Sequence, residues 1–188
     1  MNIDTLLSLH LSPASAGRRA SARRAEMFGD AVWVRNTDPV SPEARPWPTS
    51  ASAGEDVLLH VEPSDEGRRA YATWLLETGA RLPAGVAVTA FSNEAAGLHR
   101  LWCLAAARLA LPAGVRVEVR HDLVGIRLAQ IALGFGVDTF AGPLQTDRKL
   151  PLAGVTRPDE ATREGIATLV RAAGLRPVFE PPANRVAS

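Results

Sequence analysis

The feature that most constrains the fold of this chain is a regular alternation of strand-like and helix-like segments after residue 55. Short runs of Val, Leu and Ala are separated by longer amphipathic stretches that end near glycine. Such alternation is typical of parallel βαβ units. The predicted strands are 56–63, 85–92, 115–122, 137–143 and 176–181, and the predicted helices are 64–78, 93–111, 123–134 and 158–173.

Two further elements precede this region. A helix is predicted over 12–28, from Ser12 to a stop at Gly29, and a strand over 31–36. Six strands are too few for a closed eight-stranded barrel, which usually needs roughly 250 residues. We therefore expect an α/β fold: a partial (βα) barrel, or an open parallel sheet of about 5–6 strands, with helices packed on one face.

The two faces of the predicted sheet differ in polarity. Residues two apart in a strand share a face, so Val57, Leu59 and Val61 oppose Leu58, His60 and Glu62. The contrast is sharper in the third strand. There, three valines at 115, 117 and 119 oppose Arg116, Glu118 and Arg120. One face should pack on helices, while the polar face should line a lumen or meet solvent, a ligand or a partner.

The domain organisation follows from a stretch that has neither the helical nor the strand periodicity. Residues 37–54 contain four prolines together with Ser, Thr and Gly, a composition that predicts a linker. We expect an N-terminal helix and strand over 1–36, this Pro/Ser-rich linker over 37–54, and a partial TIM-barrel-like α/β domain over 55–182. Trp47 is the residue expected to attach the linker to the rest of the protein.

Composition excludes several classes of function. Lys and Arg (21) nearly balance Asp and Glu (20), so no charge excess favours nucleic acid or a membrane surface. The arginines at 18, 19, 23 and 24 are read as the solvated face of a helix. No basic leader precedes the first apolar run, and no segment approaches the roughly 20 apolar residues of a membrane span. A cytoplasmic location is expected.

The chain has one cysteine, Cys103, within an apolar helical pattern. A single cysteine cannot form an internal disulfide, a cysteine metal cage or an iron–sulfur cluster held by this chain alone. Cys103 is therefore predicted to be a small core residue, and no cofactor is predicted.

Parallel α/β folds place their sites at the carboxyl ends of strands, so the candidate site residues are expected there. Histidine beside carboxylates suits a divalent metal or acid–base chemistry, although the spacing matches no metal motif, and no phosphate-loop, nucleophile-elbow or HExxH motif is present. The residues placed at these ends are His60 and Glu62, Ser92 and Asn93, His121 and Asp122, and Asp138 and Thr139.

Each of these residues also has a structural interpretation. His121 and Asp122 are suited to capping the following helix, and Asp138 to capping a helix or turn. Glu62 is suited to pairing with Arg116 or Arg120 on a neighbouring strand. Both interpretations stay open at this level.

Three stretches, in order, resemble the C-terminal half of the radical SAM enzymes of the futalosine menaquinone route and their deazaflavin-cofactor relatives. "HVEPSDEGRRAYATWLLETGA" resembles a histidine–x–glutamate strand end with its helix, and "LHRLWCLAAARLALPAGVRVEV" the next helix and strand. "LAQIALGFGVDTFAGPL" resembles the family's glycine-rich turn, with "RPDEATREGIATLVRAAGLRPVFE" as the terminal helix and strand. The resemblance covers about 57–180, and 18–42 loosely.

The chain departs from this family where the family binds its cluster. In place of a CxxxCxxC loop and the following half-barrel stands "EARPWPTSASAG", so reductive cleavage of S-adenosylmethionine by this chain alone is excluded. The resemblance implies a substrate-facing position for His60, Glu62, Asp138 and Gly142. It leads to the hypothesis of a non-catalytic partial barrel that binds a partner or a small ligand and is accessory to menaquinone biosynthesis.

A half-barrel would leave two sheet edges and a polar lumen uncovered. A homo-oligomer, or a complex with a radical SAM enzyme, would cover them. The predicted ligand-binding residues are His60, Glu62, Asn93, His121, Asp138 and Gly142. The alternative is a small acid/base- or metal-dependent enzyme in which the side chains of His60, Glu62, His121 and Asp138 converge under a pocket.

Overall fold

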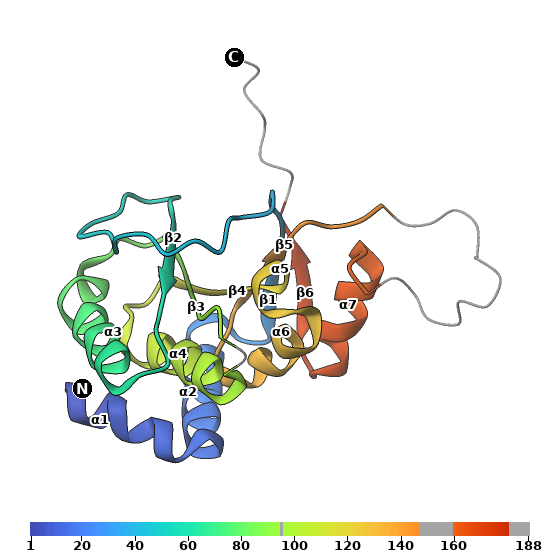
Figure 1. The fold of residues 1–188 in the computed structure, drawn as a ribbon. Helices are drawn as coiled ribbons and strands as arrows, with labels where there is room; N and C mark the ends of the chain where they lie inside the picture. The colour runs from blue at the N-terminus through green and yellow to red at the C-terminus, as the bar shows by residue number, and fades with distance from the viewer. Residues whose placement is uncertain (95, 147–159, 181–188) are drawn as a thin grey trace.

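The computed structural model describes residues 1–94, 96–146 and 160–180, and shows a sheet of six parallel strands covered by helices (Figure 1). The strand order is β2-β3-β4-β5-β1-β6. This confirms the predicted α/β class with a partial barrel or open parallel sheet. The strands are β1 (Ala31–Asn36), β2 (Asp56–His60), β3 (Ala87–Phe91), β4 (Arg116–Arg120), β5 (Thr139–Gly142) and β6 (Arg176–Phe179).

The N-terminal strand lies inside the sheet. β1 pairs in parallel with β5, with Trp33 opposite Thr139, and on its other side with β6, with Trp33 opposite Val178. The segment before the linker and the region after it therefore share one sheet. β2 and β6 form the two edges of this sheet.

The helices begin and end near the predicted signals. Ser64 caps α3 by accepting a hydrogen bond from the Gly67 N–H at 3.0 Å, as expected for a serine at this position. The helix predicted over 123–134 is divided at Gly125, whose φ of 82° interrupts it. The α-helices are α1 (Ile3–Ser8), α2 (Pro13–Phe28), α3 (Asp65–Glu77), α4 (Gly97–Ala110), α5 (His121–Val124), α6 (Ile126–Ala132) and α7 (Arg163–Ala172).

The predicted start of the last helix, Pro158, lies outside the described residues, as do residues 181 and 182 at the end of the predicted domain. Within the described part, α7 begins at Arg163 after Thr162, whose hydroxyl accepts a hydrogen bond from the Gly165 N–H.

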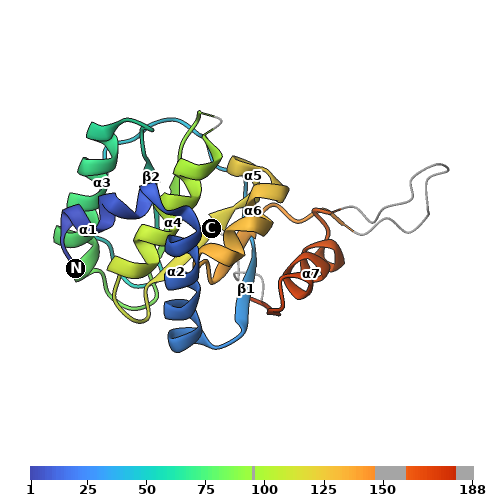
Figure 2. The same cartoon turned by 90° about the horizontal axis from the view of Figure 1, so that it is seen from below.

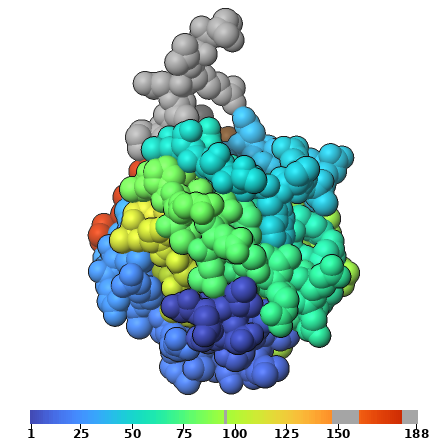
Figure 3. Space-filling view, turned by 90° about the vertical axis from the view of Figure 1, so that its left-hand side faces the viewer, coloured from blue at the N-terminus to red at the C-terminus, as the bar shows by residue number. Residues whose placement is uncertain are grey.

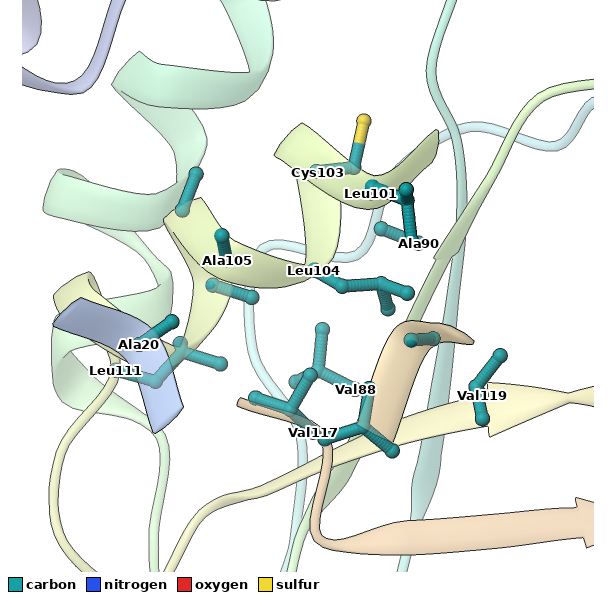
Figure 4. Packing of buried hydrophobic residues seen from close by; sticks show 14 of the residues in the cluster. Ala20, Val88, Ala90, Leu101, Cys103, Leu104, Ala105, Leu111, Val117 and Val119 are labelled. Atoms are coloured by element: carbon teal, nitrogen blue, oxygen red, sulfur yellow. The ribbon is translucent and has the colours of Figure 1, made fainter. Parts of the chain in front are cut away.

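The core lies between the helices and the valine face of the sheet. Figure 2 shows the helices that cover this face. Val57, Leu59 and Val61 are buried, as are the three valines of the β4 region, which confirms the predicted division of faces. Figure 4 shows Leu104 of α4 pointing toward Val88 and Val117. Cys103 points away from these valines and is a buried core residue, as predicted.

Ion pairs across the polar face show that the sheet is strongly curved. The Arg35 guanidinium on β1 reaches both carboxylate oxygens of Asp56 on β2, at 2.9 and 3.0 Å. These strands are four positions apart in the sheet, which in a flat sheet would be roughly 19 Å. Because an arginine side chain is much shorter than that, the polar face must be concave, like the lumen of a partial barrel.

The linker crosses this concave face. Residues 37–54 run from the end of β1 to the start of β2 over the carboxyl ends of the strands (Figure 1). In Figure 3 the linker, in light blue to cyan, packs against the rest of the protein. The Trp47 indole N–H donates to the His60 carbonyl at 3.1 Å and its ring packs edge-on against Tyr71, so Trp47 attaches the linker as predicted.

Candidate functional site: a lumen cavity beneath the linker

A cavity of about 310 Å³ lies between the polar sheet face and the linker. This volume is at the lower end of the range for small-molecule sites. The strands contribute both charged and apolar side chains, and the linker closes one wall. The lining residues are Pro39, Val40, Ser41 and Arg45 from the linker and Asp56, Val57, Leu58, Thr89, Glu118 and Arg120 from the strands.

Arg35 connects the carboxylates of the lumen. Besides Asp56, it donates to Glu118 at 2.5 Å and lies 3.3 Å from Glu180. Burial alone would lower the pKa of Arg35, but its hydrogen bonds and the charges of Asp56 and Glu118 outweigh burial and raise it. Arg35 is therefore a permanent cation that holds two carboxylates beside the cavity.

Glu118 is the most buried charged group of the lumen, with 1% of its side chain exposed. It accepts hydrogen bonds from Arg35 and from the Thr89 hydroxyl at 3.1 Å. Burial raises the pKa of Glu118, and the charge of Arg35 partly opposes this. Both carboxylate oxygens thus already have a donor within the protein.

A second ion pair forms the other wall. Arg120 at the end of β4 holds Asp122 with two hydrogen bonds, of 3.2 and 3.0 Å, and donates to the Asp38 carbonyl of the linker at 2.7 Å. The Asp122 carboxylate accepts a further bond, of 3.3 Å, from the Val40 N–H. This pair therefore fixes both the end of β4 and the start of the linker.

His60, Glu62 and Asn93 are brought together, and His60 and Asn93 contact the linker. His60 Nδ1 lies 3.3 Å from the Glu62 carboxylate, and its Nε2 accepts from the Asn93 N–H at 3.4 Å. The Asn93 side chain donates to the Pro42 carbonyl of the linker at 3.0 Å. Glu62 is more than half exposed and pairs with His60 rather than with the expected Arg116 or Arg120.

His121 and Gly142 also meet, at the carboxyl ends of β4 and β5. The His121 ring stacks on Phe140 and fills the space beside Gly142, so a Cβ added at Gly142 would lie 2.5 Å from His121 Nε2. Gly142 also has a φ of 136°, which favours glycine. Burial lowers the pKa of His121, and its Nε2 has no hydrogen-bond partner within the described residues.

Asp138 is not part of this site. It precedes β5 at the amino end of the strand, whereas the prediction placed it with Thr139 at a carboxyl end, so that placement is wrong. Its carboxylate is fully buried on the helix side of the sheet. There it accepts from Arg108 of α4 at 2.7 Å and from the Val117 N–H at 2.9 Å. The alternation of side chains turns Asp138 away from Glu118 and the lumen.

The four side chains of the alternative enzyme hypothesis do not converge. His60 and Glu62 pair with each other, His121 packs on Phe140, and Asp138 is enclosed against Arg108. Within the described ranges, no group of three or more His, Cys, Asp or Glu side chains is placed to hold a metal ion. The geometry therefore favours the cavity as the candidate site over a centre built on these residues.

The sequence interpretation did not include the Arg35 network among the site residues. Alternation does place Arg35 opposite Val34, and Glu118 opposite Val117 and Val119, so the polar face was predictable. What sequence could not supply was the curvature that brings Arg35 to Asp56.

The chain matches no protein-family profile and no curated protein at a significant level of similarity. The residues also do not fit the iron–sulfur cluster that the resemblance would imply, because Cys103 is buried in α4 and burial raises the pKa of its thiol. In the described part of the chain, no helix has both the length and the apolar character to span a bilayer.

Proposed function

We propose that this chain is a non-catalytic, partial-barrel protein that binds a small molecule in its lumen cavity. The observation that carries the proposal is the cavity itself, about 310 Å³ between a charged sheet face and a linker held in place by hydrogen bonds to three strand ends. Binding sites are concave and combine apolar walls with a few fixed polar groups. Leu58 and Val40 supply the apolar wall, and Arg120 and Glu118 the fixed polar groups.

The strand-end residues contribute indirectly in this proposal. His60, Asn93, Arg120 and Asp122 hold the linker over the cavity. The linker in turn forms one wall of the cavity. Of the pair that resembles a radical SAM strand end, His60 positions the wall of the site through its carbonyl, and Glu62 pairs with the His60 ring.

A thermal-shift screen tests the proposal. The screen would use small molecules of about ten to twenty non-hydrogen atoms, with calorimetry to confirm each hit. A ligand at about one hundred times its Kd should raise the Tm by roughly 5–10 °C. The bound compound should be recovered chemically unchanged, and a transformed product would contradict the non-catalytic part of the proposal.

Two tryptophan variants locate the binding. Leu58→Trp places an indole in the cavity and should abolish the Tm shift. Leu98→Trp, on the exposed surface of α4, is the matched control and should bind as the wild type does. If every hit stabilises both variants equally, or no compound binds, the lumen is not a ligand site.

A complex with a second copy or with a radical SAM enzyme is a second candidate function, favoured by the sheet edges. Within the described residues, β2 and β6 each pair with one neighbour only, which leaves one side of each strand without a partner strand. Unpaired edges favour strand addition. Light scattering of the purified chain should then give at least twice the mass of one chain, or co-expression with the enzyme should give a stable stoichiometric complex. A monomer that forms neither would exclude it.

A further inference from the structure

We infer that the ligand of the lumen cavity carries an oxyanion, a carboxylate or a phosphate, held between Arg120 of β4 and Arg45 of the linker. This inference rests on the proposed function, because it concerns the chemical class of the molecule in the same cavity. Its basis is a count of which donors and acceptors around the cavity are already used within the protein.

The acceptors that line the cavity are satisfied. Each oxygen of Asp56 accepts from Arg35, at 2.9 and 3.0 Å. In Glu118, one oxygen accepts from Arg35 and the other from Thr89. A cationic ligand would therefore have to displace the Arg35 guanidinium from these carboxylates. The cavity does not favour a cationic ligand for this reason.

The donors are not satisfied. Arg120 uses its Nε and Nη2 on Asp122 and the Asp38 carbonyl, and no hydrogen bond within the described residues uses its Nη1. The Arg45 guanidinium, which also lines the cavity, makes no hydrogen bond or ion pair to any described residue. Guanidinium donors match the planar geometry of a carboxylate and the oxygens of a phosphate.

The two arginines differ in how they are held. Arg120 is 4% exposed and fixed by a bidentate pair, so it presents its remaining donors in a set direction. Arg45 is exposed on the linker and can adjust to the ligand. A fixed cation on the sheet and an adjustable one on the linker would hold an anionic group from two sides.

Calorimetry and thermal shifts at constant ionic strength test this with matched probes. Succinate, succinamide and putrescine share a four-carbon chain and differ in charge, and inorganic phosphate separates phosphate from carboxylate recognition. We expect succinate or phosphate to bind, with succinamide and putrescine weaker by about tenfold or more.

Arg45→Gln should weaken the binding of the preferred anion by about tenfold. Arg19→Gln, at an exposed position of α2, is the control for general surface charge and should leave the affinity unchanged. The inference would be overturned if both variants lost affinity equally or if neither anion bound. Preferred binding of succinamide or putrescine would also overturn it. In the last case the proposed function would stand, since binding of an uncharged or cationic molecule that Leu58→Trp abolishes still places a ligand in the lumen.

Discussion

Two buried carboxylates lie on opposite faces of this sheet, and both pair with an arginine. Asp138 faces the helices, where it and Arg108 are both fully buried. Glu118 faces the lumen, where it is equally buried but its partner Arg35 remains 18% exposed. Asp138 is enclosed by protein on every side, whereas Glu118 borders a cavity of about 310 Å³.

The partners of the two carboxylates differ accordingly. Asp138 is held by groups close to it in the fold: the Val117 N–H, the Thr139 hydroxyl and Arg108, which also donates to the Val115 carbonyl. Glu118 shares Arg35 with Asp56 and Glu180, from strands across the curved sheet. The first pair joins one helix to the sheet, while the second sets the shape and charge of the lumen.

The largest expected effect is that of breaking the enclosed pair. Asp138→Asn removes the charge opposite Arg108 and leaves a fully buried guanidinium without a counter-ion. We expect a loss of about 3–5 kcal/mol in the free energy of unfolding, measured by urea denaturation at neutral pH.

A surface pair provides the control. Asp30 pairs with Arg176 with both side chains more than half exposed, so Asp30→Asn should cost at most about 1 kcal/mol. If Asp138→Asn destabilised the protein no more than this control, the view of Asp138 as an essential structural pair would be wrong.

A smaller loss is expected on the lumen side. Arg35→Met removes the cation shared by three carboxylates, but Glu118 can respond by taking up a proton because burial raises its pKa. We expect a loss of about 2 kcal/mol. The double variant Arg35→Met with Glu118→Gln should recover part of it, since no buried charge is then left unpaired. A loss as large as that of Asp138→Asn would show that the two pairs contribute equally to folding.

The strands, helices and face pattern of this fold were predictable because they depend on local sequence. Alternation in 57–62 and 115–120 fixed which side chains face the helices, and Ser64 and Gly29 marked helix ends. The position of β1 between β5 and β6 was not predictable, because no local pattern records which strands become neighbours.

The candidate site was only partly predictable for the same reason. The carboxyl ends of the strands pointed to His60, Asn93 and His121. Contacts did form among the predicted residues: His60 with Glu62 and Asn93, and His121 with Gly142. The partner of Asn93 on the linker, however, is the backbone carbonyl of Pro42, which has no sequence signal. Asp138 was misplaced because its strand begins one residue after it.

Burial raises the pKa of both carboxylates, and the pH dependence of stability tests this for Glu118. Since the folded-state pKa of Glu118 is raised, the folded protein binds its proton at a higher pH than the unfolded chain does. The free energy of unfolding of the wild type should therefore rise relative to that of Glu118→Gln as pH falls from the raised pKa to the ordinary pKa of glutamate. Below the ordinary pKa, the difference between the two proteins should stay constant. Unfolding measured across that range tests this, and a difference that shrinks as pH falls would contradict the sign.

The smallest expected effect concerns Arg45, which lines the same cavity as Glu118 yet makes no ion pair with a described residue. Arg45→Gln should change the free energy of unfolding by less than about 0.5 kcal/mol, because no buried group loses a partner. The same denaturation measurement as for Asp138→Asn checks this in the absence of ligand. A loss above about 1 kcal/mol would mean that Arg45 holds the linker in place, as Arg120 does, and is not available to a ligand. If the stability is unchanged, the effects on the free energy of unfolding fall from the Asp138–Arg108 pair to Arg35 and then to Arg45. The contribution of an ionic group to stability would then fall as its access to the cavity rises.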